Sequence, residues 1–248
     1  MKIKFFLLVF CVFLYSCASV QYTDRKALML ISEEEETQMG EKAFKEIISK
    51  SVIIKNTKEA EAIKRVGERL ASVSGKNFNW EFVLVKDNQI NAFCLPGGKI
   101  VFYSGIMPIL ENDDEIATVM SHEIAHAIAR HGAERMSHQA LVNAAGEIVS
   151  LFIEGKSEET KNIFYSAYGF GSLVGILLPY SRKHEFEADY IGLVLMKKAG
   201  YDINSALNFW QKMKKLSDNS PKIPNFLSTH PSDDERIKNI RNKIKGLN

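Results

Sequence analysis

The sequence predicts a predominantly α-helical α+β fold with a small β-sheet, and three observations support this. Residues 32–50 and 57–73 carry apolar side chains at helical spacing. Residues 79–103 read as strands, because their apolar, β-branched and aromatic side chains alternate or cluster around a Pro96-Gly97-Gly98 turn. Long helical patterns then return from Asn112 onward.

Composition indicates one globular domain. The chain has 248 residues, of which 46% are hydrophobic and 25% charged, enough to bury a core of its own. The net charge is +2, with cations and anions evenly mixed. No nucleic-acid partner is expected, because such proteins concentrate positive charge on one face.

Residues 1–16 are interpreted as a signal peptide. Basic residues precede an apolar run, Phe5 to Tyr15, which is shorter than the roughly 20 residues that a membrane-spanning helix needs. Leu14-Tyr15-Ser16-Cys17 resembles the lipobox of bacterial lipoproteins, which implies cleavage before Cys17 and its lipidation. The alternative is cleavage elsewhere, with Cys17 unmodified.

The mature part, residues 17–248, is expected to form a single domain anchored to a membrane through Cys17. Ala18, by the same resemblance, favours an outer-membrane lipoprotein that faces the periplasm. Cys94 would then be the one cysteine left for chemistry in the domain.

The early helices have identifiable ends. The first begins at Ser32, and the acidic run Glu33 to Glu36 complements the dipole of its first turn. Gly75 ends the second. The later helix opens at Asn112, where Glu115 three residues on completes a capping-box pattern.

That later helix contains the motif His-Glu-x-x-His at residues 122–126. His122 and His126 lie one turn apart on one face, so both rings can bind one ion. Glu123 is placed beside them, where it can contact a water without filling a coordination position. This is the zincin signature. The plain alternative is a pair of core histidines.

A catalytic zinc needs a third protein ligand. The segment His184-Glu185-Phe-Glu187-Ala-Asp189 offers carboxylates four residues apart on a helix. We expect Glu185 to bind the metal and Asp189 to accept a hydrogen bond from a ligand histidine. Glu187 is expected to be a surface or structural residue, although a swap with Glu185 stays open, and His184 is expected to face solvent.

Four segments together resemble the HtpX-like and CAAX prenyl protease-like family of gluzincin metallopeptidases, in particular its periplasmic lipoproteins of the LoiP and BepA type. They are the two motifs above, Asn91 to Gly98, and Ser228-Thr-His-Pro231 with Arg236-Ile237. The resemblance implies a zincin-like domain, with the small sheet beside the zinc helices, that cleaves unfolded or misassembled envelope proteins in quality control.

The expected mechanism uses one Zn²⁺ per chain, held by His122, His126 and Glu185, with Glu123 as general base. An edge strand at Asn91, Ala92 and Phe93 is expected to bind an extended substrate by strand addition; the alternative is a plain hairpin.

The resemblance also implies that His230 approaches the zinc, either in the open position at rest or as an oxyanion stabiliser. The alternative is an ordinary loop histidine. His230 precedes Ser232-Asp-Asp-Glu235. This segment has a capping-box pattern, which is expected to start a last helix that runs to about Lys245. His131 and His138 carry no comparable argument.

Two further stretches are predicted to be helical: residues 135–155 as a cover over the cleft, and the charge-free residues 163–181 as a buried helix near the zinc rather than a membrane span. Two other functions stay open. One is a peptide-binding chaperone that rarely cuts; the other is a deformylase-like hydrolase with Cys94 as a metal ligand.

Overall fold

The computed structural model describes residues 17–162, 166, 178–219 and 224–247. The predicted signal peptide and most of the predicted buried helix at 163–181 lie outside these residues. By its contacts the chain divides into two compact units, one of residues 1–32 and 130–184 and the other of residues 33–129 and 185–248. The α+β prediction is confirmed, with helices predominating.

The first unit pairs a small β-hairpin with a long helix. Strands β1 (Cys17–Ser19) and β2 (Lys26–Leu28) are antiparallel. Helix α5 (His131–Ile153) begins directly after Arg130, whose left-handed backbone (φ 56°) redirects the chain. The backbone N–H of Leu30 donates to Ser137 Oγ of α5 at 2.9 Å, so the N-terminal segment is attached to this helix.

The second unit contains a four-stranded sheet in the order β3-β4-β6-β5. Its strands are β3 (Ile53–Ile54), β4 (Glu81–Val85), β5 (Ala92–Leu95) and β6 (Lys99–Tyr103). β4 and β6 are parallel, and the outer pairs are antiparallel. The β5–β6 turn contains Gly97 and Gly98 at φ 76° and 84°, values that favour glycine.

The second unit also contains helices, some packed on the sheet and others packed on those helices. They are α2 (Glu33–Lys50), α3 (Lys58–Val73), the 3₁₀ helix η1 (Ser104–Ile109), α4 (Asp113–Ala129), the later part of α7 (Leu178–Ala199), α8 (Asn204–Asp218), α9 (Asn225–Thr229) and α10 (Asp234–Leu247). Within the described residues, no helix is both long and apolar enough to cross a bilayer.

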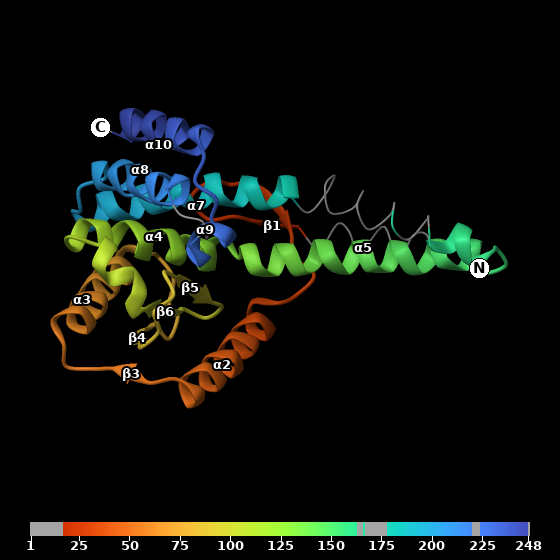
Figure 1. Cartoon of the computed structure of the whole chain (residues 1–248), viewed down its shortest axis with the longest axis horizontal. Coiled ribbons are helices and arrows are strands. Elements are labelled where there is room, and N and C mark those ends of the chain that lie inside the picture. The colour runs from red at the N-terminus through yellow and green to blue at the C-terminus, as the bar shows by residue number, and fades with distance from the viewer. Residues whose placement is uncertain (1–16, 163–165, 167–177, 220–223, 248) are drawn as a thin grey trace. The chain divides into compact units, whose positions relative to one another are not determined.

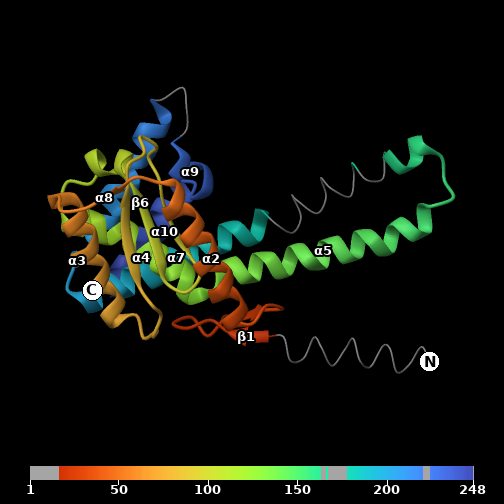
Figure 2. The ribbon, with the colours of Figure 1, turned by 90° about the horizontal axis from the view of Figure 1, so that it is seen from below.

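Helix α4 is the centre of this unit. It lies between the sheet and helices α7 and α8, with α10 packed beyond α8 (Figure 1). α3 packs against β4 and α4, whereas α2 packs Phe44 onto the face of the sheet that carries Val85 and Val101 (Figure 2). Thirteen of the 17 residues of α4 are buried, polar ones included. A helix buried on nearly all sides can hold polar side chains only where partners meet them, so its histidines require a specific environment.

Two helix starts test the predicted caps, and one of them follows the prediction. Asn112 Oδ1 accepts the backbone N–H of Glu115 at 2.9 Å, as predicted. The last helix was expected to be capped by Ser232. Instead Asp233 Oδ1 accepts the N–H of Arg236 at 2.8 Å, while Ser232 Oγ donates to the Trp210 carbonyl. The predicted cap was wrong because a tertiary partner takes the serine hydroxyl.

Candidate metal centre

Four side chains of the second unit converge on one point: His122, His126, Glu185 and His230. The first two project from α4 one turn apart, Glu185 comes from α7, and His230 follows the end of α9. All except His126 are buried. Three of the four are the ligands predicted from spacing, and the fourth is the histidine implied by resemblance.

The distances within this set fit a tetrahedral metal site. Glu185 Oε2 lies 3.0 Å from His230 Nδ1 and 3.2 Å from His122 Nε2. His122 Nε2 lies 3.1 Å from His126 Nε2 and 3.2 Å from His230 Nδ1. Four donors placed about 2.0 to 2.1 Å from one ion at tetrahedral angles would lie roughly 3.3 to 3.4 Å apart. The donor set therefore fits one ion such as Zn²⁺.

Asp189 lies behind His122, as expected for the residue that orients a ligand ring. Its Oδ1 is 3.0 Å from His122 Nδ1, so the ring can donate there and keep Nε2 for a metal. Arg236 donates two hydrogen bonds to the same carboxylate, from Nε at 2.7 Å and from Nη2 at 2.8 Å. Asp189 is thus held from both sides.

Arg236 was quoted in the sequence only as part of a motif, without a role. It is 1% exposed, and its Nη1 lies 3.1 Å from Glu185 Oε2. A signal was present in the sequence: Arg236 shares the apolar face of the last helix with Ile237, Ile240 and Ile244. A charged residue on such a face indicates a buried partner.

Glu123 lies beside the donor set without joining it. Its Oε2 accepts the backbone N–H of Cys94 at 3.1 Å. Its Oε1 is buried, makes no hydrogen bond within the described residues, and lies 3.5 Å from His230 Nε2. A buried carboxylate oxygen without a hydrogen bond suits a group that acts on a water or substrate, so the placement matches the predicted base.

The charges of the site shift its pKa values. Burial alone would lower the pKa of His122, but Asp189 and Glu185 outweigh it and raise this pKa to about 9. Burial tends to raise the pKa of Glu185, and the charges of His230, Arg236 and His126 bring it well below its usual range. Burial raises the pKa of Glu123, partly offset by His230 and His122. Glu185 is thus suited to bind a cation, and Glu123 to accept a proton.

The predicted substrate strand, β5, is an edge strand of the sheet. The main-chain N–H and C=O groups of its residues point alternately toward β6 and away from it. The Asn91 carbonyl accepts from Tyr103 N–H at 3.0 Å, toward β6. Because main-chain groups alternate along an antiparallel strand, the main chain of Phe93 also faces β6, whereas the main-chain groups of Ala92 and Cys94 point away from β6. The Cys94 N–H is taken by Glu123, and Ala92 is buried with 0% of its surface exposed, so the Cys94 N–H and the main chain of Ala92 are both covered in this structure.

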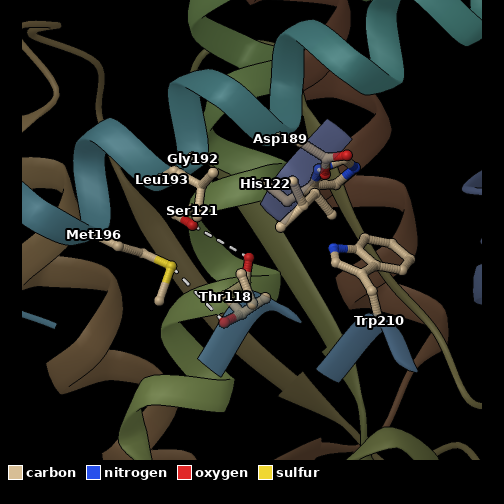
Figure 3. A pocket seen from close by; sticks show the side chains of 10 residues that line it. Thr118, Ser121, His122, Asp189, Gly192, Leu193, Met196 and Trp210 are labelled. Carbon is tan, nitrogen blue, oxygen red and sulfur yellow. Dashed lines mark hydrogen bonds and ion pairs between the residues drawn. The ribbon is translucent and has the colours of Figure 1, made fainter. Parts of the chain in front are cut away.

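A cavity of about 10 Å³ lies against His122 and Asp189, between α4, α7 and α8 (Figure 3). It has room for about one water molecule, far too little for a substrate. Gly192 of α7 faces Ser121 there. A Cβ on Gly192 would lie 3.1 Å from Ser121 Oγ and 3.3 Å from the backbone nitrogen of His122. A larger residue at this position would therefore require a small shift of Ser121 or of α7.

The first unit holds another group of histidines, around Glu134. This carboxylate accepts from Arg25 at 2.7 and 2.6 Å and lies 2.9 Å from His184 Nε2. The His184 ring stacks on His131, with centroids 4.2 Å apart. His184 was expected to face solvent, which was wrong: it is 5% exposed because these two partners enclose it.

Glu187 and Cys94 were considered in the sequence analysis, the first as a surface or structural residue and the second as a metal ligand in one alternative function. Glu187 is buried rather than on the surface, and it is outside the four-residue donor set. Cys94 is also outside that set; its Sγ donates to the Leu95 carbonyl at 3.2 Å. Burial, with the charges of Glu123 and Glu36, raises the pKa of the Cys94 thiol well above its usual value, which disfavours the thiolate that a metal would need.

Comparison with known proteins gives consistent matches. The family described as Peptidase family M48 matches residues 57–244. The chain is 34% identical over 225 residues to "Mitochondrial metalloendopeptidase OMA1" of Schizosaccharomyces pombe, covering 89% of this chain and 64% of that protein. It is 30% identical over 221 residues to "Beta-barrel assembly-enhancing protease" of Yersinia pestis, covering 88% and 45%. The chain thus spans less than two thirds of these relatives.

Proposed function

This chain belongs to peptidase family M48, a family of metalloproteases, and from that premise we propose that it is a zinc-dependent endopeptidase. The observation that carries the proposal is the convergence of His122, His126, Glu185 and His230 at mutual distances near 3 Å, with the unbonded Oε1 of Glu123 beside them. The donor chemistry, imidazole and carboxylate, suits zinc.

When bound, zinc would polarise a peptide carbonyl and make a water more acidic. Glu123 then takes the proton of the attacking water on Oε1 and passes it to the leaving amine. The bond from the Cys94 N–H fixes Oε2 so that Oε1 faces the site. His122 keeps its orientation through Asp189.

We further propose that His230 fills the fourth position of the site at rest. Its Nδ1 lies within the donor set, 3.0 Å from Glu185 Oε2, which supports this role more than that of an oxyanion stabiliser. His230→Ala is expected to raise the initial cleavage rate of an unfolded substrate. A lower rate would favour the oxyanion role, and an unchanged rate would remove both.

The proposed substrates are unfolded or misassembled envelope proteins, bound as an added strand along the edge strand β5. Strand addition gives affinity without demanding one sequence, which suits such substrates. We propose that the protein is an outer-membrane lipoprotein anchored through Cys17 and facing the periplasm. Replacing Cys17 by Ala should abolish labelling with a radioactive fatty acid.

The test uses the purified chain without the signal peptide. We expect about one zinc per chain, cleavage of casein, and loss of cleavage with a chelator. Glu123→Gln should retain the zinc and lose at least about 100-fold in rate. Full turnover in that variant would contradict the assignment of the base, and a metal-free active protein would contradict the proposed function.

Two alternatives are separated by the same assay. A peptide-binding chaperone would suppress aggregation of an unfolded protein with or without chelator, and would leave casein intact. A deformylase-like site would need Cys94 as a ligand, so Cys94→Ser would lose the metal. We expect this variant to keep it, because the Cys94 thiol lies outside the donor set.

A further inference from the structure

A buried arginine at the start of α10 contacts several parts of the metal centre at once. Arg236 donates Nε and Nη2 to the two oxygens of Asp189. Its Nη1 donates to the Pro231 carbonyl at 3.0 Å and lies 3.1 Å from Glu185 Oε2. The guanidinium lies 3.5 Å from the centre of the Trp210 ring, which covers one face.

We propose that Arg236 is a positioning residue that sets the geometry of the metal ligands. Through Asp189 it fixes the ring of His122, and through Nη1 it fixes the carboxylate of Glu185. Through the Pro231 carbonyl it holds the residue next to His230. One side chain thereby reaches three of the four donors without touching substrate. This inference rests on the proposed metal site.

The fork of the guanidinium, rather than its charge, is what the site requires. Its Nε and Nη2 match the two oxygens of Asp189, while Nη1 points to Glu185 and Pro231. A lysine ammonium is a point charge and cannot span these acceptors. Positive charge by itself repels a metal cation, so a purely electrostatic role would weaken metal binding and its removal would strengthen it. Positioning predicts the opposite sign.

The experiment measures zinc affinity of the metal-free chain by competition with a chromophoric chelator, in parallel with the free energy of unfolding of the metal-free protein. The variants are Arg236→Met and Arg236→Lys. The control is Arg241→Met, on an exposed position of the same helix. Loss of a residue that orients metal ligands costs about 10- to 100-fold in metal affinity, so we expect both Arg236 variants to weaken zinc binding by about that factor and the control to change nothing.

A second pair of variants tests whether Arg236 orients His122 through its hydrogen bonds to Asp189. Asp189→Asn alone and together with Arg236→Lys should weaken zinc binding by similar factors, because both disturb one chain of contacts to His122. Arg236→Lys keeps the buried charge and carries the test if Arg236→Met fails to fold.

The outcomes are separable. An unchanged zinc affinity in Arg236→Lys overturns the proposal even if stability falls, because the role would then be structural or electrostatic. Tighter zinc binding in Arg236→Met also overturns it. If the unaltered chain itself binds no zinc, the proposed function fails first, and this shows before any variant is compared.

Discussion

The two units each bury a group of histidines and carboxylates, and the two groups are organised differently. Around Glu134 the carboxylate is at the centre, with nitrogen groups around it: Arg25 donates twice and His184 Nε2 lies 2.9 Å away. At the metal centre His122, His126 and His230 are instead grouped with Glu185, and their donor atoms face one another at 3.0 to 3.4 Å.

This difference separates a metal site from a buried ion network. In the Glu134 group each charge has an opposite charge within the protein, so the group is satisfied without a ligand. At the metal centre ring nitrogens and a carboxylate crowd together with lone pairs directed at one point, which is stable when a cation lies between them. Composition alone, histidine with glutamate, would not distinguish the two.

The largest effect is expected from removing a ligand at the metal centre. Glu185→Ala deletes the carboxylate donor, and the loss should exceed the roughly 100-fold cost of removing a residue that merely orients a ligand. Zinc content after dialysis should fall to near zero. Glu134→Ala, the matching change in the other group, should leave zinc content unchanged. Equal losses of zinc in Glu185→Ala and Glu134→Ala would contradict the distinction between a metal site and a buried ion network.

The second prediction concerns stability. Glu134→Gln removes the buried carboxylate charge that accepts two hydrogen bonds from Arg25 and should lower the free energy of unfolding by about 3 kcal/mol. Urea unfolding of the metal-free protein measures this. Glu147→Gln, on an exposed position of the same helix, is the control and should change stability by less than about 0.5 kcal/mol. A Glu134→Gln variant as stable as the control would show that the ion network contributes nothing.

The third prediction is the pH dependence of that contribution. Burial tends to raise the pKa of Glu134, but His184 and Arg25 outweigh it and lower this pKa from 4.5 to about 2. A lowered pKa in the folded state stabilises above the unfolded value and is lost as pH falls through the folded one. The stability difference between wild type and Glu134→Gln should therefore shrink as the pH falls from about 4.5 to 2. A difference that persists unchanged at pH 2 would contradict the ion-pair account.

The smallest effect is expected at the contact between α4 and α7. In Gly192→Ala the new methyl group would lie 3.1 to 3.3 Å from Ser121 Oγ and the backbone nitrogen of His122. The overpacking costs about 1 to 3 kcal/mol, and the higher helix propensity of alanine offsets about 1 kcal/mol of that cost. Because Glu185 and Asp189 are on α7, zinc affinity should also fall. Thermal unfolding with and without zinc measures both, and an unaffected zinc affinity would show that α7 adjusts freely.

The sequence predicts best what a single helix determines. His122 and His126 could be placed together because helical spacing alone brings them to one face, and the same argument placed Glu185 near Asp189. Strands and helices were predicted where apolar periodicity is continuous, as in β4, β6 and α3. The Pro96-Gly97-Gly98 turn followed from residues that favour positive φ.

Contacts between distant segments were predicted least. The burial of His184 depends on Glu134 and Arg25, which lie 50 and 159 positions before it in the sequence. The cap of α10 shifted to Asp233 because Trp210, on another helix, takes the Ser232 hydroxyl. Arg236 was overlooked although it lies on an apolar helix face, a pattern that a sequence can show.

X-ray absorption at the zinc edge of the purified, unaltered chain tests the central claim most directly. The account predicts about one zinc per chain with only nitrogen and oxygen neighbours near 2.0 to 2.1 Å and the outer-shell signal of imidazole rings. That imidazole signal should weaken in His126→Ala. A sulfur neighbour near 2.3 Å, or zinc bound equally well without His126, would contradict it.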